Sequence, residues 1–198
     1  MITDTNSLRD TEKRYLLDVG CGNKPTTKDG FITIGFDLRT MTKAAVVGNV
    51  EHPLPFASNV FDEIYCYNIL EHVHKIIQLL EELYRVGKPG AIIKILSPHF
   101  SGMDAHQDIT HVRGFGSRAF YPFIGKNPEL SHYAKCQFKL LKRKIIFWQI
   151  TELGNVRIQE WFGLGIIANK LTSIYERFLC YLFPAHQIYF ELEIEKVN

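Results

Sequence analysis

The chain has 198 residues, 46% of them hydrophobic, with 23 lysines and arginines against 21 aspartates and glutamates. This length and apolar content suffice for one compact domain spanning residues 1–198 and argue against a second one. A net charge of +2 gives no electrostatic reason to expect a nucleic-acid partner. No apolar run reaches the ~20 residues needed to cross a bilayer, so we expect no transmembrane segment.

The first residues and the cysteines indicate the compartment. Residues 1–13 are polar and mixed in charge, without the apolar stretch of a secretory signal, so we expect a polar arm. The cysteines stand far apart, without the close pairing of a zinc site or the density of a secreted scaffold; they are Cys21, Cys66, Cys136 and Cys180. We therefore expect reduced thiols in a cytoplasmic protein.

Short β-type runs alternate with helical runs in the first half of the chain. Isoleucine and leucine recur at helical spacing in residues 71–86. The sequence GKPG predicts the end of this helix, with Gly87 suited to a left-handed cap. The predicted strands are each apolar enough to be covered on both faces; they are residues 14–19, 31–38, 44–50, 61–70 and 91–98. This alternation predicts an α/β domain with a mostly parallel sheet and helices on both faces.

Beyond residue 98 the pattern loosens. Residues 99–130 are rich in histidine, glycine and aromatic residues, and such a long insertion is more often functional than idle. Within it, Ser117 is a candidate cap for a short helix. Residues 138–150 and 188–197 are predicted strands that would pair antiparallel at one edge of the sheet. The segment 151–187 between them is expected to be a helical cover whose apolar side packs on the core or forms a homodimer surface.

The sequence LLDVGCGNKP ends the first predicted strand in a bend with two glycines. Ligands of open α/β sheets collect beyond the carboxyl ends of the strands, and Gly20 and Gly22 let the backbone approach a ligand closely. Glycines are common in tight turns, so a purely structural role stays open at this point. Asp37 ends the second strand, where a carboxylate can accept both ribose hydroxyls of a nucleoside. Asn49 ends the third strand, where its amide can bond an adenine amine. Together these strand ends predict a nucleoside site.

At these residues the sequence resembles the class I S-adenosylmethionine-dependent methyltransferases. LLDVGCGNKP looks like the first motif of that family, LPFASNVFDEIYCYNILEHV like its fourth-strand block, and LYRVGKPGAIIKILSP like the helix and strand that follow. The likeness covers most of the chain up to Pro98. It implies a Rossmann-like fold with a seven-stranded, mostly parallel sheet and an antiparallel strand at the edge.

The resemblance also implies a cofactor site. A family member would bind S-adenosylmethionine with its ribose at Asp37, its adenine near Asn49 and Val50 and its methionyl part near Asp18 and Asn68, and would release S-adenosylhomocysteine. The third glycine that a dinucleotide fold places at the helix start is missing, which disfavours a nicotinamide cofactor. The full set of expected cofactor residues is Asp18, Gly20, Cys21, Gly22, Asp37, Leu38, Asn49, Val50 and Asn68.

The insertion offers the residues for methyl transfer. The acceptor atom must lie in line with the methyl group, and a hydroxyl acceptor gains from a base that removes its proton. His106 or His111 could serve as this base, with Asp108 orienting the imidazole. We expect His99 and Arg113 to bind the substrate, with Arg113 suited to a carboxylate or phosphate group.

Two other interpretations of the insertion stay open. Asp108 and His111 could tie the loop down through caps and backbone hydrogen bonds. The histidines and aspartates of the insertion could also bind a divalent metal ion, although their spacing matches no fixed signature. His72 is expected at the floor of the pocket and His74 in solvent. We predict O-methylation of a small, sugar-like or partly apolar acceptor; the alternatives are a non-catalytic cofactor-binding regulator or subunit, and a metal-assisted enzyme.

Overall fold

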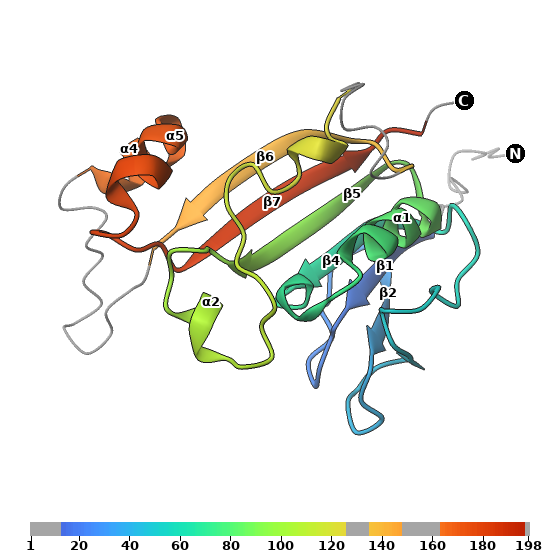
Figure 1. Cartoon of the computed structure of the whole chain (residues 1–198). Helices are drawn as coiled ribbons and strands as arrows, with labels where there is room; N and C mark the ends of the chain where they lie inside the picture. The colour runs from blue at the N-terminus through green and yellow to red at the C-terminus, as the bar shows by residue number, and fades with distance from the viewer. Residues whose placement is uncertain (1–12, 126–134, 148–162, 197–198) are drawn as a thin grey trace, which may run out of the picture.

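One sheet organises the protein. The computed structural model describes residues 13–125, 135–147 and 163–196. The strands within these residues are β1 (Arg14–Val19), β2 (Phe31–Asp37), β3 (Val46–Val47), β4 (Phe61–Tyr67), β5 (Gly87–Pro98), β6 (Phe138–Ile146) and β7 (Gln187–Ile194). They form a single sheet in the order β3-β2-β1-β4-β5-β7-β6 (Figure 1). Strands β1 to β5 are parallel to their neighbours among themselves, whereas β7 runs antiparallel to β5 and β6. The predicted sheet and its antiparallel edge are confirmed.

Helices are fewer than the alternating pattern predicts. The described helical segments are η1 (Leu70–His72), α1 (Ile76–Val86), α2 (Asp104–Gln107), η2 (Tyr121–Phe123), α4 (Leu164–Lys170), α5 (Thr172–Ile174) and the π-helical turn η4 (Tyr175–Leu179). The connections 20–30, 38–45 and 48–60 contain turns and bends but no helix. The strands β1 to β4 are therefore linked by loops that gather at the ends of the sheet. Within the described chain, helical segments between two parallel strands occur only between β4 and β5, where η1 precedes α1.

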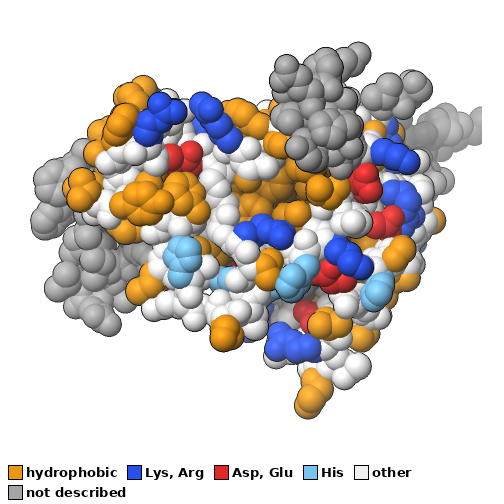
Figure 2. All heavy atoms as spheres, viewed as in Figure 1, with side chains coloured by type: hydrophobic (Ala, Val, Ile, Leu, Met, Phe, Trp, Pro, Cys, Tyr) orange, Lys and Arg blue, Asp and Glu red, His pale blue; other side chains and the backbone are white. Residues whose placement is uncertain are grey.

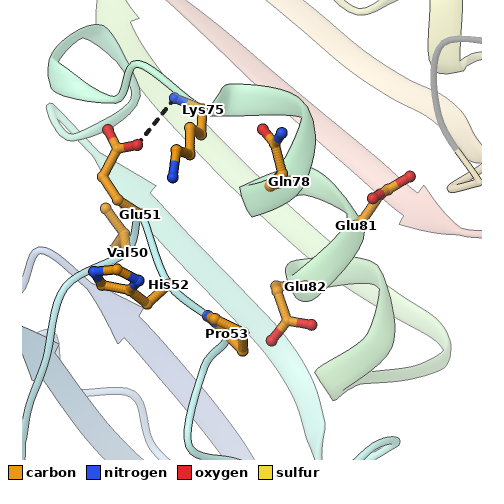
Figure 3. Close-up of a pocket in the computed structure, with 8 residues that line it drawn as sticks. All are labelled: Val50, Glu51, His52, Pro53, Lys75, Gln78, Glu81 and Glu82. Carbon is orange, nitrogen blue, oxygen red and sulfur yellow. Dashed lines mark hydrogen bonds between the residues drawn. The ribbon is translucent and has the colours of Figure 1, made fainter.

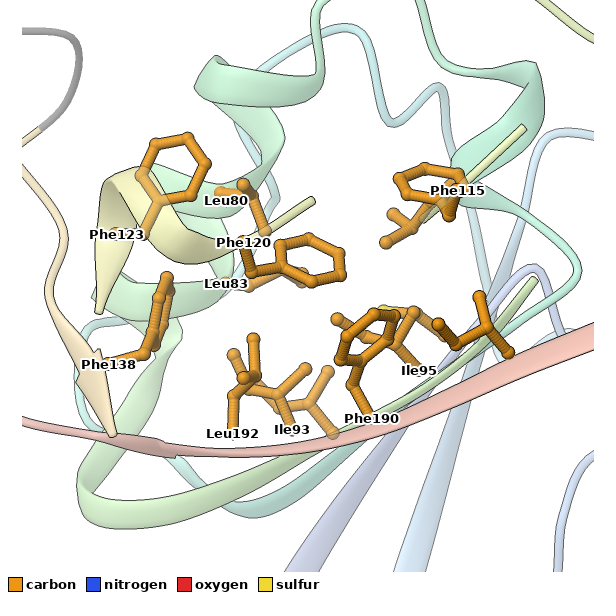
Figure 4. Close-up of a cluster of buried hydrophobic side chains, with 14 of the residues drawn as sticks. Leu80, Leu83, Ile93, Ile95, Phe115, Phe120, Phe123, Phe138, Phe190 and Leu192 are labelled. Carbon is orange, nitrogen blue, oxygen red and sulfur yellow. The ribbon is translucent and has the colours of Figure 1, made fainter. Parts of the chain in front are cut away.

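The main hydrophobic core lies on the face of the sheet that packs against α1. In β7, Ile188, Phe190, Leu192 and Ile194 are buried, while the alternate residues face the other way and are half-buried. Phe120 packs edge-to-face on Phe190, with 4.9 Å between ring centroids. Figure 4 shows this core, to which α1, the insertion, β5, β6 and β7 contribute Leu80, Leu83, Ile93, Ile95, Phe115, Phe120, Phe123, Phe138, Phe190 and Leu192.

The opposite face of β4, β5 and β7 is polar in the described residues. Lys94 of β5 forms an ion pair with Glu63 of β4 at 3.3 Å, and it donates a hydrogen bond to the Tyr65 hydroxyl at 3.0 Å. Tyr189 of β7 bonds Glu191 on the same face. β4 and β5 are therefore not covered by apolar groups on both faces, contrary to the expectation from the sequence. One face of each strand is buried and apolar, and the other is half-buried and carries polar groups.

Two local predictions are wrong. Gly87 is extended, with φ −75° and ψ 146°, and begins β5 instead of capping α1 in a left-handed conformation; the left-handed glycine of the turn is Gly90, with φ +77°. Ser117 caps no helix. Its backbone N–H and its hydroxyl both donate to the carboxylate of Glu176, each at 2.6 Å. A distant acidic partner thus takes the role that local helix capping was expected to fill.

The helical cover is broken into short pieces. Residues 166–183, predicted as one amphipathic helix, form α4, α5 and η4 in succession. Tyr175 and Cys180 are fully buried, whereas Phe178 and Tyr181 are 68% and 78% exposed. None of the helices in the described part of the chain is long and apolar enough to span a membrane.

Some sequence predictions lie outside the described residues. They are the polar arm up to residue 12, the end of the insertion from residue 126, the strand residues 148–150, and the start of the cover at residues 151–162.

At the far edge of the sheet, the pairing of β6 with β7 shifts register between Leu140 and Lys142, which marks a β-bulge.

Candidate functional site

The bend after β1 is held against β2 by backbone hydrogen bonds. Gly20 and Cys21 both donate their N–H groups to the carbonyl oxygen of Phe36, at 2.8 and 3.3 Å. Gly20 and Gly22 have φ angles of +73° and +55°, which glycine adopts without steric cost. A Cβ atom on Gly22 would have no neighbour within 4 Å. At Gly22 the backbone of this bend therefore faces open space, as a ligand-binding turn requires, whereas a Cβ on Gly20 would lie 3.0 Å from Ile69.

Asp37 closes the second side of the bend. Its Oδ2 accepts the N–H of Gly22 at 2.8 Å, and its Oδ1 accepts the N–H of Arg39 at 3.0 Å. The residue is 7% exposed. Each carboxylate oxygen can accept more than one hydrogen bond, so both retain capacity for hydroxyl donors from a ligand. The bond to Gly22 joins the end of β1 to the end of β2. The edge of the sheet formed by Asp18, Gly20, Gly22 and Asp37 is called the rim below.

Asp18 places a second carboxyl group below the same bend. It is 4% exposed, and its Oδ2 accepts the N–H of Thr26 at 2.6 Å. Burial raises the pKa of Asp18, and the hydrogen bond to Thr26 offsets this effect only in part. A positively charged ligand group would relieve the cost of this buried charge. The chemistry of the rim thus suits a molecule with hydroxyls at one end and a cation at the other.

The remaining predicted cofactor residues surround this rim more loosely. Leu38 is 64% exposed directly after Asp37. The amide oxygen of Asn49 accepts the N–H of Glu51 at 2.9 Å. Asn68, at the end of β4, has a φ angle of +51°, and its amide oxygen accepts a hydrogen bond from Gln187 at 2.9 Å. Cys21 is buried at 8% exposure.

The insertion is pinned to η1 and the residues after it. Val112 donates its N–H to the carbonyl oxygen of Glu71 at 2.8 Å. The Arg113 guanidinium donates to the carbonyl oxygens of Val73 and His74, at 2.6 and 3.4 Å. These bonds leave other N–H donors of Arg113 for an anionic group. The predicted role of Arg113 in substrate binding stays a prediction.

The histidines of the insertion fall into separate environments. His106 is exposed, and its Nε2 lies 3.1 Å from the carbonyl oxygen of Phe100. His111 is half-buried, and its ring lies against that of His72, with 4.6 Å between the centroids. The exposed Asp108 has an oxygen 3.9 Å from Nε2 of His111. The predicted catalytic residues His111 and Asp108 are therefore together, whereas His106 faces its own carbonyl partner.

His99 is fully buried, unlike the other histidines of the insertion. Its Nδ1 lies 2.8 Å from the Ser101 hydroxyl, and its Nε2 lies 3.3 Å from the Glu176 carboxylate. Glu176 also binds Ser117, so it links two positions of the insertion to the helical cover. A direct contact between His99 and a substrate would require the side chain to leave this position. His99 is therefore better suited to position the insertion, and its contact with a substrate stays a prediction.

The face that carries α1 and the insertion is polar beside an apolar hollow. Figure 2 shows histidine, cationic and acidic side chains over its lower half, next to a hollow lined by hydrophobic side chains. A separate pocket of about 320 Å³ lies beside α1 (Figure 3), lined by Val50, Glu51, His52, Pro53, Lys75, Gln78, Glu81 and Glu82. Only Val50 of this pocket belongs to the predicted cofactor residues. The pocket is thus distinct from the bend after β1.

Sequence reasoning missed two acidic residues that organise this region. Glu71 is 1% exposed in the middle of η1 and contributes to a group with His72 and His111. Glu176 connects the cover to the insertion. Nothing in the sequence could have paired Glu176 with His99.

Comparison with known proteins gives a family match over part of the chain and a shared fold over most of it. Residues 17–95 match the family described as "Methyltransferase domain". A methyltransferase from Archaeoglobus fulgidus described as SAM dependent has a TM-score of 0.60 at 18% identity, over 92% of this chain and 87% of that chain. The YcgJ protein from Bacillus subtilis has a TM-score of 0.60 at 15% identity, over 94% and 93%. No curated protein matches the chain.

A third solved structure contains a ligand pair. Phosphoethanolamine N-methyltransferase 2 from Haemonchus contortus was solved with phosphomonomethylethanolamine and S-adenosylhomocysteine. It has a TM-score of 0.54 at 16% identity, over 93% of this chain and 49% of that chain. At such identities the solved structures show a shared fold, and the family match covers residues 17–95.

Proposed function

We propose that this chain is a class I S-adenosylmethionine-dependent methyltransferase that methylates a hydroxyl oxygen of a small-molecule acceptor; the family match and the shared fold support this. The observation that supports the cofactor site is the joined rim of β1 and β2. Two buried carboxyl groups, Asp18 and Asp37, flank a glycine bend that faces open space at Gly22. The insertion, with its exposed and half-buried histidines, supplies the acceptor side.

S-adenosylmethionine fits the charges and donors of this rim. Asp37 would accept the ribose hydroxyls, and the buried Asp18 would favour the positively charged methionyl end. Gly20, Cys21 and Gly22 would lie under the cofactor, and Leu38 and Val50 would border the adenine. Asn49 retains its amide N–H donors and a second lone pair on its oxygen for the base. Asn68 would meet the methionyl part.

The reaction needs the acceptor oxygen to lie in line with the methyl group, and it needs one group that accepts the proton of the hydroxyl. The hydroxyl oxygen of the acceptor forms a bond to the methyl carbon while the carbon–sulfur bond breaks, which leaves S-adenosylhomocysteine. We assign the released proton to Nδ1 of His106. The Nε2 atom of His106 must carry a hydrogen to bond the Phe100 carbonyl, so the neutral ring keeps its lone pair on Nδ1. Asp108 and Arg113 would hold the acceptor, with His111 beside them.

The size of the acceptor is proposed from the composition of the site. The apolar hollow beside the histidines suits a partly apolar or sugar-like molecule. The Haemonchus contortus enzyme was solved with a small phosphorylated amine, which supports a small ligand for a protein of this fold.

We further propose that the present chain works in the cytoplasm, where its buried thiols stay reduced. Exposed Phe178 and Tyr181 offer a surface for a homodimer.

Two measurements test the proposed function. Titration calorimetry with S-adenosylmethionine and S-adenosylhomocysteine should show binding of both, and a panel of hydroxyl acceptors should yield a methylated product by mass spectrometry. His106→Ala should lower kcat at least tenfold and leave the affinity for S-adenosylhomocysteine unchanged, because the ring acts on the acceptor proton. His52→Ala, an exposed histidine outside the insertion, is the control. Full turnover by His106→Ala would rule out His106 as the base, and the absence of cofactor binding would overturn the whole proposal.

A further inference from the structure

We infer that Glu71, His72 and His111 bind a divalent transition-metal ion beside the cofactor rim. One ligand atom from each of the three residues lies within 4.8 Å of the other two. Glu71 and His72 belong to η1, which follows β4, and His111 comes from the insertion. The fold thus brings together three side chains that the sequence separates. Metal binding is independent of the proposed function, and only the role of the ion rests on it.

The Glu71 carboxylate is the first argument for a bound cation. The residue is 1% exposed, and among the described residues neither of its oxygens has a hydrogen-bond partner. A buried carboxylate without a hydrogen-bond partner is destabilising. A cation held between Glu71 and the two imidazoles would balance its charge, which gives a reason for an acid at this position.

The hydrogen bonds of the histidines are the second argument. Nδ1 of His111 lies 2.8 Å from the carbonyl oxygen of Asp104, so it must carry the hydrogen. The Thr110 hydroxyl donates to Asp108 at 2.6 Å and lies 2.9 Å from Nδ1 of His72, so His72 also donates from Nδ1. Both neutral rings therefore keep their lone pairs on Nε2. Metal-binding histidines are usually oriented in this way by a carbonyl or carboxylate partner on the other nitrogen.

The donor set indicates which ions would bind. Two imidazole nitrogens and one carboxylate suit Zn²⁺, Fe²⁺ and Mn²⁺, and they leave coordination positions open, whereas Mg²⁺ and Ca²⁺ prefer oxygen ligands. Asp108, 3.9 Å from Nε2 of His111, adds negative charge next to the site. In the proposed reaction an open position would take the acceptor hydroxyl and lower its pKa. His106 lies outside the ligand set and stays available for the proton.

Metal binding is tested without cofactor or turnover. The full chain is stripped with a chelator and titrated by calorimetry with Zn²⁺ and, separately, with Mn²⁺. We expect about one equivalent per chain for at least one of the two ions, and a matching metal content by elemental analysis. Glu71→Gln and His111→Ala should each weaken the affinity at least tenfold. His74→Ala should bind like the wild type, since this neighbouring histidine is exposed and outside the group.

The Glu71→Gln variant separates a lost ligand from a lost fold. It keeps the shape of the side chain and removes a buried charge, so the metal-free variant should unfold at the same temperature as the wild type or at a higher one. Wild-type protein that binds neither ion, or Glu71→Gln and His111→Ala variants that bind like the wild type, would overturn the metal site. Titration of the stripped protein with S-adenosylhomocysteine keeps the two proposals apart, because binding there without metal binding removes only the metal site.

Discussion

The backbone N–H of Gly22 and the carboxylate of Asp37 are joined by a 2.8 Å hydrogen bond across 15 residues of sequence. This bond connects the bend after β1 to the end of β2. It gives Asp37 two tasks, because the same carboxylate that is proposed to accept ribose hydroxyls also holds the bend in place. Changes at Asp37 and in the bend should therefore affect cofactor binding together.

Removal of the Asp37 carboxylate should weaken cofactor binding. Asp37→Ala loses charge-assisted hydrogen bonds worth about 1.5–3 kcal/mol, or roughly 10- to 100-fold in Kd for S-adenosylhomocysteine. Asp37→Asn keeps one acceptor oxygen and should lose less. Calorimetry on the two variants measures the difference. Wild-type affinity in Asp37→Ala would show that the ribose lies elsewhere.

The two glycines of the bend should respond differently to alanine. A Cβ on Gly20 would lie 3.0 Å from the side chain of Ile69, whereas one on Gly22 would meet nothing within 4 Å. In both variants the left-handed φ angle lowers the free energy of unfolding by about 1–2 kcal/mol, and the contact with Ile69 lowers it further in Gly20→Ala. Urea unfolding should rank Gly20→Ala as the less stable variant. Gly22→Ala should weaken cofactor binding more than its stability loss suggests; equal affinity to the wild type would contradict a cofactor over this bend.

Asp18→Asn should stabilise the cofactor-free protein and weaken cofactor binding. Because burial raises the pKa of Asp18, its carboxyl group favours folding while it is protonated and opposes folding once ionised. The wild type should therefore lose stability relative to Asp18→Asn as the pH rises from about 4 toward neutrality. Thermal unfolding of both proteins across this range checks the sign. A variant that is less stable at neutral pH would show that the hydrogen bond to Thr26 outweighs the burial of the charge.

Glu176→Gln should destabilise the protein at neutral pH. Burial alone would raise the pKa of Glu176, but hydrogen bonds from His99 and Ser117 outweigh it and lower the pKa. The ionised group therefore adds stability above about pH 4.5, and this contribution is lost as the pH falls further. We expect a loss of about 1–2 kcal/mol at pH 7, by urea unfolding, and a smaller difference from the wild type at pH 3. A difference independent of pH would contradict this account.

The sequence was sufficient to place the strands, whereas the cofactor residues stay predictions. The predicted strand 44–50 is reduced to Val46–Val47, and β4 ends at Tyr67 instead of residue 70. β1 has the predicted bounds, and β2 ends one residue earlier than expected, at Asp37. These predictions succeeded because the apolar runs are local and the resemblance fixed their order. The half-buried face of β5 could not be predicted from its sequence, because Lys94 is the only charged residue in the run AIIKILSP.

Other features depend on contacts between distant residues. α1 begins at Ile76 instead of Glu71, because the N–H groups of His74 and Lys75 donate to the Glu51 carboxylate and η1 takes the residues before them. The pairing of His99 with Glu176 joins residues 77 positions apart. Local patterns cannot predict such partners, and for the same reason the grouping of Glu71 and His72 with His111 emerges only from the fold.

The bulge in β6 bears on self-association. β6 is the outermost strand on its side of the sheet, and exposed Lys139 and Lys142 flank the place where its register shifts. A twisted strand edge bearing lysines resists pairing with an edge from another molecule. Two copies of the chain should therefore not join into one continuous sheet through β6, and a dimer would have to form through side chains elsewhere on the surface.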